Sequence, residues 1–205
     1  MEPVREALLE WGVLLVQDKR LPSVVGIITG ETLHMSWWSH PEAQEIFATL
    51  GQLSDDPDIL FTKLLYRKET LVHRRLWSAL LAVATAREPW QLEGLSTGAR
   101  QLIDKLDQNF QPIRASGPVV KELTARLLAN TQQVHTESGR HETVVEPWSV
   151  WSHRVGCAPV PRVSEGRHVL EQATLALGAS VGALPWRAGA LCQRLPTSGC
   201  TRARD

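Results

Sequence analysis

Helical periodicity interrupted by turn residues is the feature of this sequence that most restricts its fold. Apolar side chains recur at intervals of three or four residues in several stretches, and β-branched or alternating patterns occupy much of the sequence between them. Proline, glycine and aspartate separate the two kinds of pattern. No apolar stretch approaches the roughly 18 residues of a membrane-spanning helix. We therefore expect an α+β protein built from short elements, with no membrane partner.

Composition fits such a fold and narrows the possible partners. Of the 205 residues, 43% are hydrophobic and 21% are charged, as is usual for a protein with a packed core. The formal net charge is zero, so binding to nucleic acid would need a local basic patch. The three cysteines lack CxxC spacing, which favours reduced thiols over a disulfide framework or a zinc site. The acidic, amphipathic first residues differ from a secretory signal, so we expect a cytoplasmic protein.

Residues 1–88 are predicted to form an α+β part, with a first helix followed by two units that each consist of a β-hairpin and a helix. Ser39 and Glu42 fit a capping box at the start of the helix in the first unit, with Pro41 in its first turn. The predicted elements are a helix over 3–17, strands near 23–28 and 32–38, a helix through 46–53, strands near 59–65 and 70–75, and a helix over 76–86.

A different order of elements follows over residues 90–150. The stretch "LSTGARQLIDKLDQ" predicts a capped helix, "NFQPIRAS" a connector, "GPVVKELTARLLA" a second helix, and "TQQVHTESGRHETVVEPW" two strands around Ser138-Gly139. Across residues 92–148 this order resembles the winged helix-turn-helix superfamily. The resemblance implies DNA binding through the second helix. It equally implies protein docking, because such a fold does not decide its function.

The C-terminal part is predicted to be less regular. An irregular linker and a last helix should occupy residues 151–184, with the helix packing back on one of the earlier parts. Residues 185–205 show no periodicity and are expected to form a flexible tail. The stretches "SWWSHPEAQEIF", "HRRLW" and "VHTESGRHE" together are similar to an uncharacterised group of bacterial proteins. That resemblance implies a bacterial cytosolic protein and assigns no activity.

Trp37, Trp38 and His40 form the first candidate site. Neighbouring residues of a strand face opposite sides, so one tryptophan should pack inward against Ile46 or Phe47. The other could be exposed and stack on a nucleobase, or it could contact a second buried layer. A helix start disfavours positive charge, so His40 is expected to be a neutral hydrogen-bonding residue rather than a catalytic base.

The second candidate site is the densest basic stretch, "YRKETLVHRRLW". Arg67 and Lys68 fall at a predicted hairpin tip, where cations can contact phosphate. Arg74 and Arg75 should point to opposite faces if that segment is extended, so one of them would be an ion-pair partner or a ligand contact. A solvated charged surface is the alternative explanation.

The third candidate site is the second helix of the winged-helix-like block together with its wing. Lys121, Thr124 and Arg126 would lie on the exposed face of that helix and could read base edges. Arg140 and His141 would lie at the wing, where an arginine can enter a minor groove. Glu122 and Glu137 repel phosphate, so this block predicts weak, salt-sensitive binding.

No motif for nucleotide binding, zinc proteolysis or serine hydrolysis is present, and we predict no cofactor and no metal. The leading hypothesis is a DNA-associated protein, of a regulatory or repair type, that binds through its winged-helix-like module and a basic, aromatic surface. One alternative is a protein-interaction module, or a homodimer, without nucleic-acid binding. The other is an enzyme with a pocket around Trp38, His40 and His73.

Overall fold

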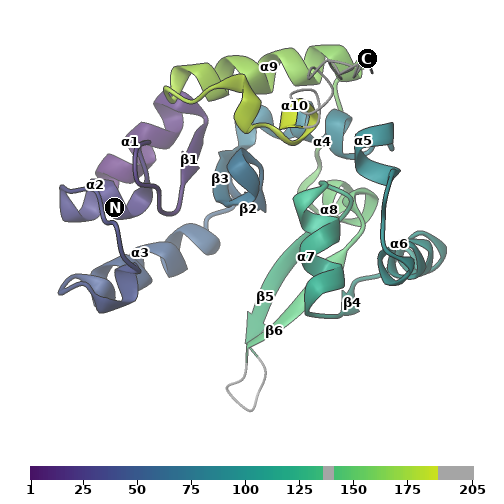
Figure 1. Cartoon of the computed structure of the whole chain (residues 1–205), viewed down its shortest axis with the longest axis horizontal. Helices are drawn as coiled ribbons and strands as arrows, with labels where there is room; N and C mark the ends of the chain where they lie inside the picture. Colours follow the sequence, from purple (N-terminus) through teal and green to yellow (C-terminus); the bar gives the residue numbers. More distant parts are fainter. Residues whose placement is uncertain (136–140, 189–205) are drawn as a thin grey trace, which may run out of the picture.

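Two small antiparallel sheets, each three strands wide, lie in different parts of the molecule among helices (Figure 1). The computed structural model describes residues 1–135 and 141–188. The predicted α+β class is confirmed. Along the chain the helices and strands are α1 (Glu2–Trp11), β1 (Val13–Leu15), α2 (Val24–Thr29), α3 (Ala43–Ser54), β2 (Ile59–Lys63), β3 (Glu69–His73), α4 (Trp77–Ala84), α5 (Pro89–Leu92), α6 (Thr97–Asn109), β4 (Ile113–Arg114), α7 (Pro118–Ala125), β5 (Asn130–His135), β6 (His141–Glu146), α8 (Trp148–Val155), α9 (Val163–Ala176) and α10 (Pro185–Ala188).

The first sheet has the order β1-β3-β2, and Thr70, Leu71 and Val72 of its central strand are buried. Val72 of β3 lies opposite Val13 of β1 and Leu60 of β2. The hairpin predicted over 59–75 is therefore confirmed, with its strands at β2 and β3. The strand β1 was missed, because the predicted first helix was too long. Gly12 ends α1 with a φ of 79°, a left-handed conformation that glycine adopts without strain.

The hairpin predicted over 23–38 is wrong. The β-branched run that begins at Val24 forms α2, because Ser23 caps the helix by accepting a hydrogen bond from the Gly26 amide at 3.1 Å. The capping box at Ser39 is wrong too, since α3 begins at Ala43. His40 lies just before this start, and its Nδ1 accepts a hydrogen bond from the Glu42 amide at 3.2 Å.

The second sheet has the order β4-β6-β5, and α6 and α7 pack with it around a separate apolar cluster. Ile103, Leu123 and Val145 are buried there. Ser96 caps α6 by accepting a hydrogen bond from the Ala99 amide at 3.2 Å, as predicted for a capped helix. The order helix, helix, hairpin is confirmed, and the predicted connector contains the short strand β4.

The C-terminal part is more ordered than predicted. The expected linker contains α8, whose Trp148 and Trp151 are buried. The expected tail begins with α10, where Trp186 is buried and its Nε1 donates to Glu171 Oε1 at 3.1 Å. Residues 189–205 of the predicted tail lie outside the described residues.

The predicted parts share one main core. Leu80 of α4, Leu127 after α7 and Leu170 of α9 belong to the same apolar cluster. The helix α9 lies along α4, and Gly166 permits the close approach, because a Cβ there would lie 2.6 Å from the Ala79 carbonyl oxygen.

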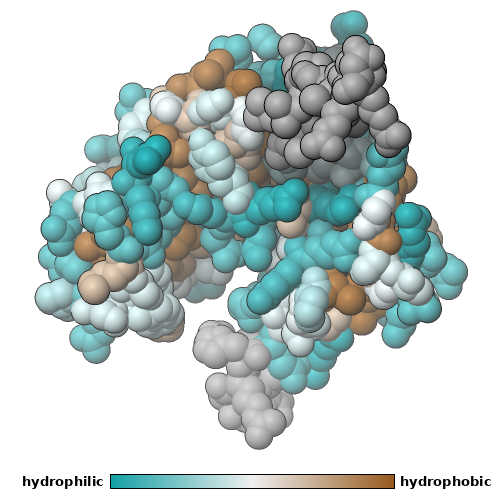
Figure 2. Space-filling view, in the orientation of Figure 1, coloured by the Kyte–Doolittle hydropathy of each residue, from teal (hydrophilic) through white to brown (hydrophobic). Residues whose placement is uncertain are grey.

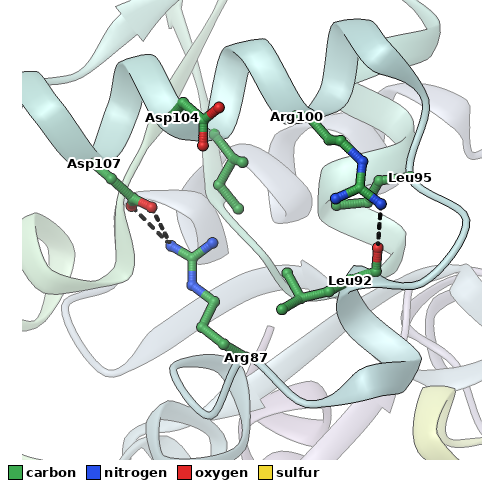
Figure 3. Close-up of a pocket in the computed structure, with 7 residues that line it drawn as sticks. Arg87, Leu92, Leu95, Arg100, Asp104 and Asp107 are labelled. Carbon is green, nitrogen blue, oxygen red and sulfur yellow. Dashed lines mark hydrogen bonds and ion pairs between the residues drawn. The ribbon is translucent and has the colours of Figure 1, made fainter.

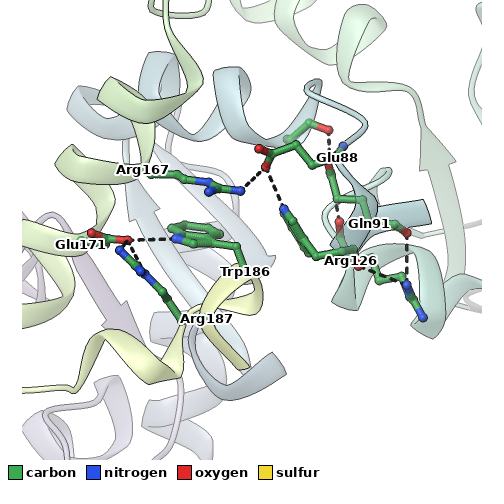
Figure 4. Close-up of polar contacts among 9 residues, drawn as sticks. Glu88, Gln91, Arg126, Arg167, Glu171, Trp186 and Arg187 are labelled. Carbon is green, nitrogen blue, oxygen red and sulfur yellow. Dashed lines mark hydrogen bonds and ion pairs between the residues drawn. The ribbon is translucent and has the colours of Figure 1, made fainter. Parts of the chain in front are cut away.

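Polar contacts reinforce this junction (Figure 4). Arg167 of α9 donates to Glu88 Oε2, which also accepts a hydrogen bond from Trp90 Nε1 at 2.8 Å. Gln91 is fully buried, and its amide donates to the carbonyl oxygens of Ala84 and Arg126. The helix α9 is thereby attached to the start of α5, and α5 in turn is attached to the ends of α4 and α7. Among the described helices, none combines the length and the hydropathy that crossing a bilayer requires.

Candidate nucleic-acid interface

Trp37 and Trp38 lie in a 3₁₀ turn, Trp37–Ser39, rather than in a strand. Trp37 is buried among Val25, Leu33 and Ile46. Trp38 is 63% exposed, so the prediction of one inward and one outward ring is confirmed. The geometry differs from the strand prediction, because the two indoles stack with centroids 3.9 Å apart and planes at 24°. One face of Trp38 therefore rests on a buried ring.

Other large apolar side chains are exposed near Trp38. Met35 is 68% exposed, and Phe47, 54% exposed, lies with its ring centroid 5.8 Å from that of Trp38. Figure 2 shows hydrophilic side chains over much of the face it presents, with the hydrophobic residues in separate areas rather than one continuous band. We call Trp38 with its neighbour Phe47 the Trp38 shelf.

His40 has a structural environment. Its Nε2 lies 3.2 Å from Glu31 Oε1, and its Nδ1 lies 3.9 Å from Glu42 Oε2. Together with the hydrogen bond from the Glu42 amide, these contacts make it a hydrogen-bonding residue that joins the segment after α2 to the start of α3.

His73 lies at the end of β3 and shares none of these partners. Its Nδ1 accepts a hydrogen bond from the Arg75 amide at 3.4 Å. Burial, together with the nearby Arg75 guanidinium, lowers the pKa of His73. Neither histidine lines either of the two grooves described below.

Arg74 and Arg75 have protein partners. Arg74 Nη1 donates to Asp58 Oδ1 at 2.9 Å, and Arg75 Nη2 donates to the Glu10 carbonyl oxygen at 2.8 Å. Both lie at the opposite end of β3 from Arg67 and Lys68. Arg74 is thus an ion-pair partner, which is one of the roles expected for this arginine pair, and Arg75 attaches the end of β3 to α1.

The β2–β3 tip is an exposed turn in an uncommon conformation. Tyr66 and Arg67 have φ values of 52° and 57°, and the Lys68 amide donates to the Leu65 carbonyl oxygen at 2.8 Å. Asn-Gly is the usual pair in a turn with positive φ at both central positions, because other residues are strained there. Tyr66 is 48% exposed. Arg67 is also exposed and forms no ion pair with any described residue.

A second loop, residues 17–21, connects this tip to the Trp38 turn. Lys68 Nζ donates to Asp18 Oδ2 at 2.6 Å, and the Gln17 side chain donates to the Met35 carbonyl oxygen at 2.7 Å. Asp18 Oδ1 accepts the amides of Arg20 and Leu21. Burial alone would raise the pKa of Asp18, but the hydrogen bonds from Lys68 and from these amides outweigh it and lower that pKa.

Charge in these two segments is unbalanced. Residues 17–21 and 63–69 carry five basic side chains and two acidic ones, an excess of three positive charges in a chain of zero net charge. The basic residues are Lys19, Arg20, Lys63, Arg67 and Lys68, and the acidic ones are Asp18 and Glu69. Lys19 and Arg20 are exposed. We call loop 17–21, the tip 66–68 and the Trp38 shelf together the tip–shelf surface.

The predicted recognition helix, α7, has little polar surface left. Thr124 is buried, and its hydroxyl donates to the Val120 carbonyl oxygen at 3.0 Å. Arg126 Nη1 donates to the carbonyl oxygens of Trp90, Gln91 and Glu93. Base contacts by Thr124 and Arg126 are therefore corrected to structural roles, and only Lys121 of the three is exposed. Arg140 and the side chain of His141 lie outside the described residues.

A shallow groove of about 270 Å³ lies between α5 and α6 (Figure 3). Both of its arginines are engaged with other residues of the protein. Arg87 Nη2 donates to both carboxylate oxygens of Asp107, at 2.8 and 3.0 Å, and Arg100 donates to the Leu92 carbonyl oxygen. A second groove lies at Arg114 and Glu142, which pair with each other at 3.2 Å.

Sequence reasoning identified Trp38, Arg67 and Lys68 in this surface and missed Lys19, Arg20, Tyr66 and Phe47. The run Asp18-Lys19-Arg20 was visible in the sequence as a charged turn after an apolar segment, but the residues that lie beside it in the folded protein were not.

In the part of the chain that the structure describes, no cluster of three or more His, Cys, Asp or Glu residues could hold a metal ion. No family model, curated protein or solved structure matches this chain.

Proposed function

We propose that this protein binds nucleic acid through the tip–shelf surface. The observation that supports the proposal is the excess of three positive charges on two adjoining exposed loops of a chain with no net charge. Neutralisation of phosphate by lysine and arginine dominates the affinity of such interfaces. Phosphate contacts would come mainly from Lys19, Arg20 and Arg67, which are exposed and have no acidic partner among the described residues.

The conformation of the tip supports the same proposal. A strained backbone at a surface turn persists where the side chains it presents are useful, because the fold alone would favour a relaxed turn. Here the strained pair is Tyr66 and Arg67, an aromatic ring beside a guanidinium. Lys68 is held by Asp18, which fixes the tip against loop 17–21.

Fluorescence anisotropy of labelled oligonucleotides tests this function. We expect binding at micromolar protein in about 50 mM salt, with an oligonucleotide of about 15 nucleotides, which covers the usual site size of one small domain. Arg67→Ala and the double variant Lys19→Ala/Arg20→Ala should each weaken binding several-fold. Lys105→Ala, on the exposed side of α6, is the matched control and should leave binding unchanged. Absence of binding to single-stranded and duplex oligonucleotides alike, or an equal loss in Lys105→Ala, would refute the proposal.

A second candidate function is self-association or protein docking on the apolar side chains of the same region. The specific observation in its favour is that Met35, Trp38 and Phe47 are all more than half exposed. Light scattering distinguishes it: a homodimer would show a mass that rises with concentration and that Phe47→Ala returns to the monomer value.

A further inference from the structure

Trp38 is an exposed aromatic side chain in the turn that adjoins loop 17–21. We propose that the Trp38 shelf stacks on an unpaired nucleobase and makes the tip–shelf surface select single-stranded over duplex nucleic acid. This inference rests on the proposed function, which concerns phosphate binding and leaves the strandedness of the ligand open.

The geometry of the two indoles provides one stacking face. Trp37 covers one side of Trp38 at 3.9 Å and 24°, and Trp37 itself is buried among Val25, Leu33 and Ile46. The 63% exposure of Trp38 therefore belongs mainly to its opposite face and its edges. Because the buried ring holds the exposed one in place, stacking would cost little side-chain entropy.

A single open aromatic face distinguishes the two forms of nucleic acid. In a duplex, each base is already stacked above and below, so a protein ring reaches a base face only after unstacking that costs a few kcal/mol. Single strands present base faces freely, and stacking of a base on an aromatic side chain is sequence-tolerant.

The surrounding charges indicate the direction in which a bound nucleic-acid strand would leave the Trp38 shelf. Gln17 bonds the Met35 carbonyl, so loop 17–21 with Lys19 and Arg20 adjoins the turn that carries Trp38. The carboxylates of Glu31 and Glu42 are engaged by His40, at 3.2 and 3.9 Å from its ring nitrogens. A strand with one base on Trp38 would therefore run toward the cations of loop 17–21 and the tip. Tyr66, 48% exposed at the tip, offers a second ring along this direction.

Paired anisotropy titrations with single-stranded and duplex oligonucleotides of equal length test the inference. We expect the wild-type protein to bind the single strand about tenfold more tightly, and Trp38→Ala to lose roughly tenfold for the single strand with little change for the duplex. Trp38→Phe should restore part of the affinity, because it keeps an aromatic face. Leu175→Ala, at an exposed apolar residue of α9, is the control and should bind as wild type.

The possible failures can be told apart. Equal binding of both forms, or equal loss for both in Trp38→Ala, overturns the stacking inference and leaves the proposed function standing. Loss of all binding in the wild type overturns the proposed function itself. Circular dichroism of Trp38→Ala should match the wild type, and its Tm should fall only modestly, because the variant loses the stacking on Trp37 but keeps the buried core. A folded spectrum shows that any loss of affinity does not come from misfolding.

Discussion

Individual residues with identical chemistry have very different roles here. Trp37 and Trp38 are neighbours in the sequence, yet one is part of a buried cluster and the other is exposed. The alternation of side chains between the two faces of a strand predicted this difference. The stacking of the two rings depends on a 3₁₀ turn, which the β-branched residues before it did not indicate. Likewise, the arginines of "HRRLW" were expected to include an ion-pair partner or a ligand contact, and their partners are Asp58 and the Glu10 carbonyl, 16 and 65 positions away in the sequence.

His73 gives a prediction about pH at the residue scale. Its pKa is lowered in the folded protein from an ordinary value of 6.5, so the unfolded chain binds this proton at a higher pH than the folded one. The free energy of unfolding should therefore fall as pH drops through 6.5 toward the folded pKa. His73→Asn keeps an acceptor for the Arg75 amide and removes the proton, so its unfolding free energy should fall less between about pH 7.5 and about pH 5.5. Urea titrations at each pH measure this difference, and parallel curves would contradict it.

At the scale of elements, the sequence was informative where local and long-range signals agreed. The strands β2 and β3 and the helices α6 and α7 have clear periodicity and turn residues at their ends. The helix α2 was missed because Val24, Val25, Ile27 and Ile28 favour strands, and the Ser23 cap and the burial of the valines override that preference. The helix α8 was missed because its apolar positions are few, and its two tryptophans reach the core only in the folded protein.

The turn at the tip predicts opposite effects on stability and binding. Replacing Tyr66-Arg67 by Asn-Gly should raise the free energy of unfolding by about 1–2 kcal/mol, because the strain of two left-handed residues is relieved. The same double variant should bind oligonucleotides more weakly than Arg67→Ala, because it removes both side chains. Thermal unfolding measures the gain in stability, and fluorescence anisotropy measures the loss of binding. A less stable variant, or one that binds as tightly as the wild type, would show that the tip is not strained for binding.

The contact between α4 and α9 gives a second prediction at this scale. Alanine is favoured over glycine in a helix by about 1 kcal/mol, yet Gly166→Ala should destabilise the protein by about 1–3 kcal/mol. The reason is the Ala79 carbonyl oxygen, 2.6 Å from the place where the new Cβ would lie. Gly51→Ala on α3 is the matched control: nothing lies within 4 Å of its Cβ position, so it should stabilise. Urea denaturation of both variants measures the two signs, and stabilisation by Gly166→Ala would contradict this packing.

At the scale of the whole molecule, the sequence predicted single residues of the tip–shelf surface but not that its separate segments come together. Loop 17–21 reaches the tip through a contact between residues 50 positions apart, and it reaches the Trp38 turn through one between residues 18 apart. Periodicity and turn signals act over far shorter distances. The polar groups of α7 were misjudged for the same reason, because Arg126 bonds carbonyl groups of α5 and of the loop that follows it. The shared core of Leu80, Leu127 and Leu170 was equally out of reach.

The salt dependence of single-strand binding tests the central claim most directly. If three uncompensated cations contact phosphate, the logarithm of the association constant should fall with the logarithm of salt concentration with a slope of about −2, at about −0.7 per contact. Arg67→Ala should reduce the magnitude of that slope by about 0.7, while Lys105→Ala leaves it unchanged. A slope near zero, or one that Arg67→Ala does not alter, would show that the tip–shelf surface is not where phosphate binds.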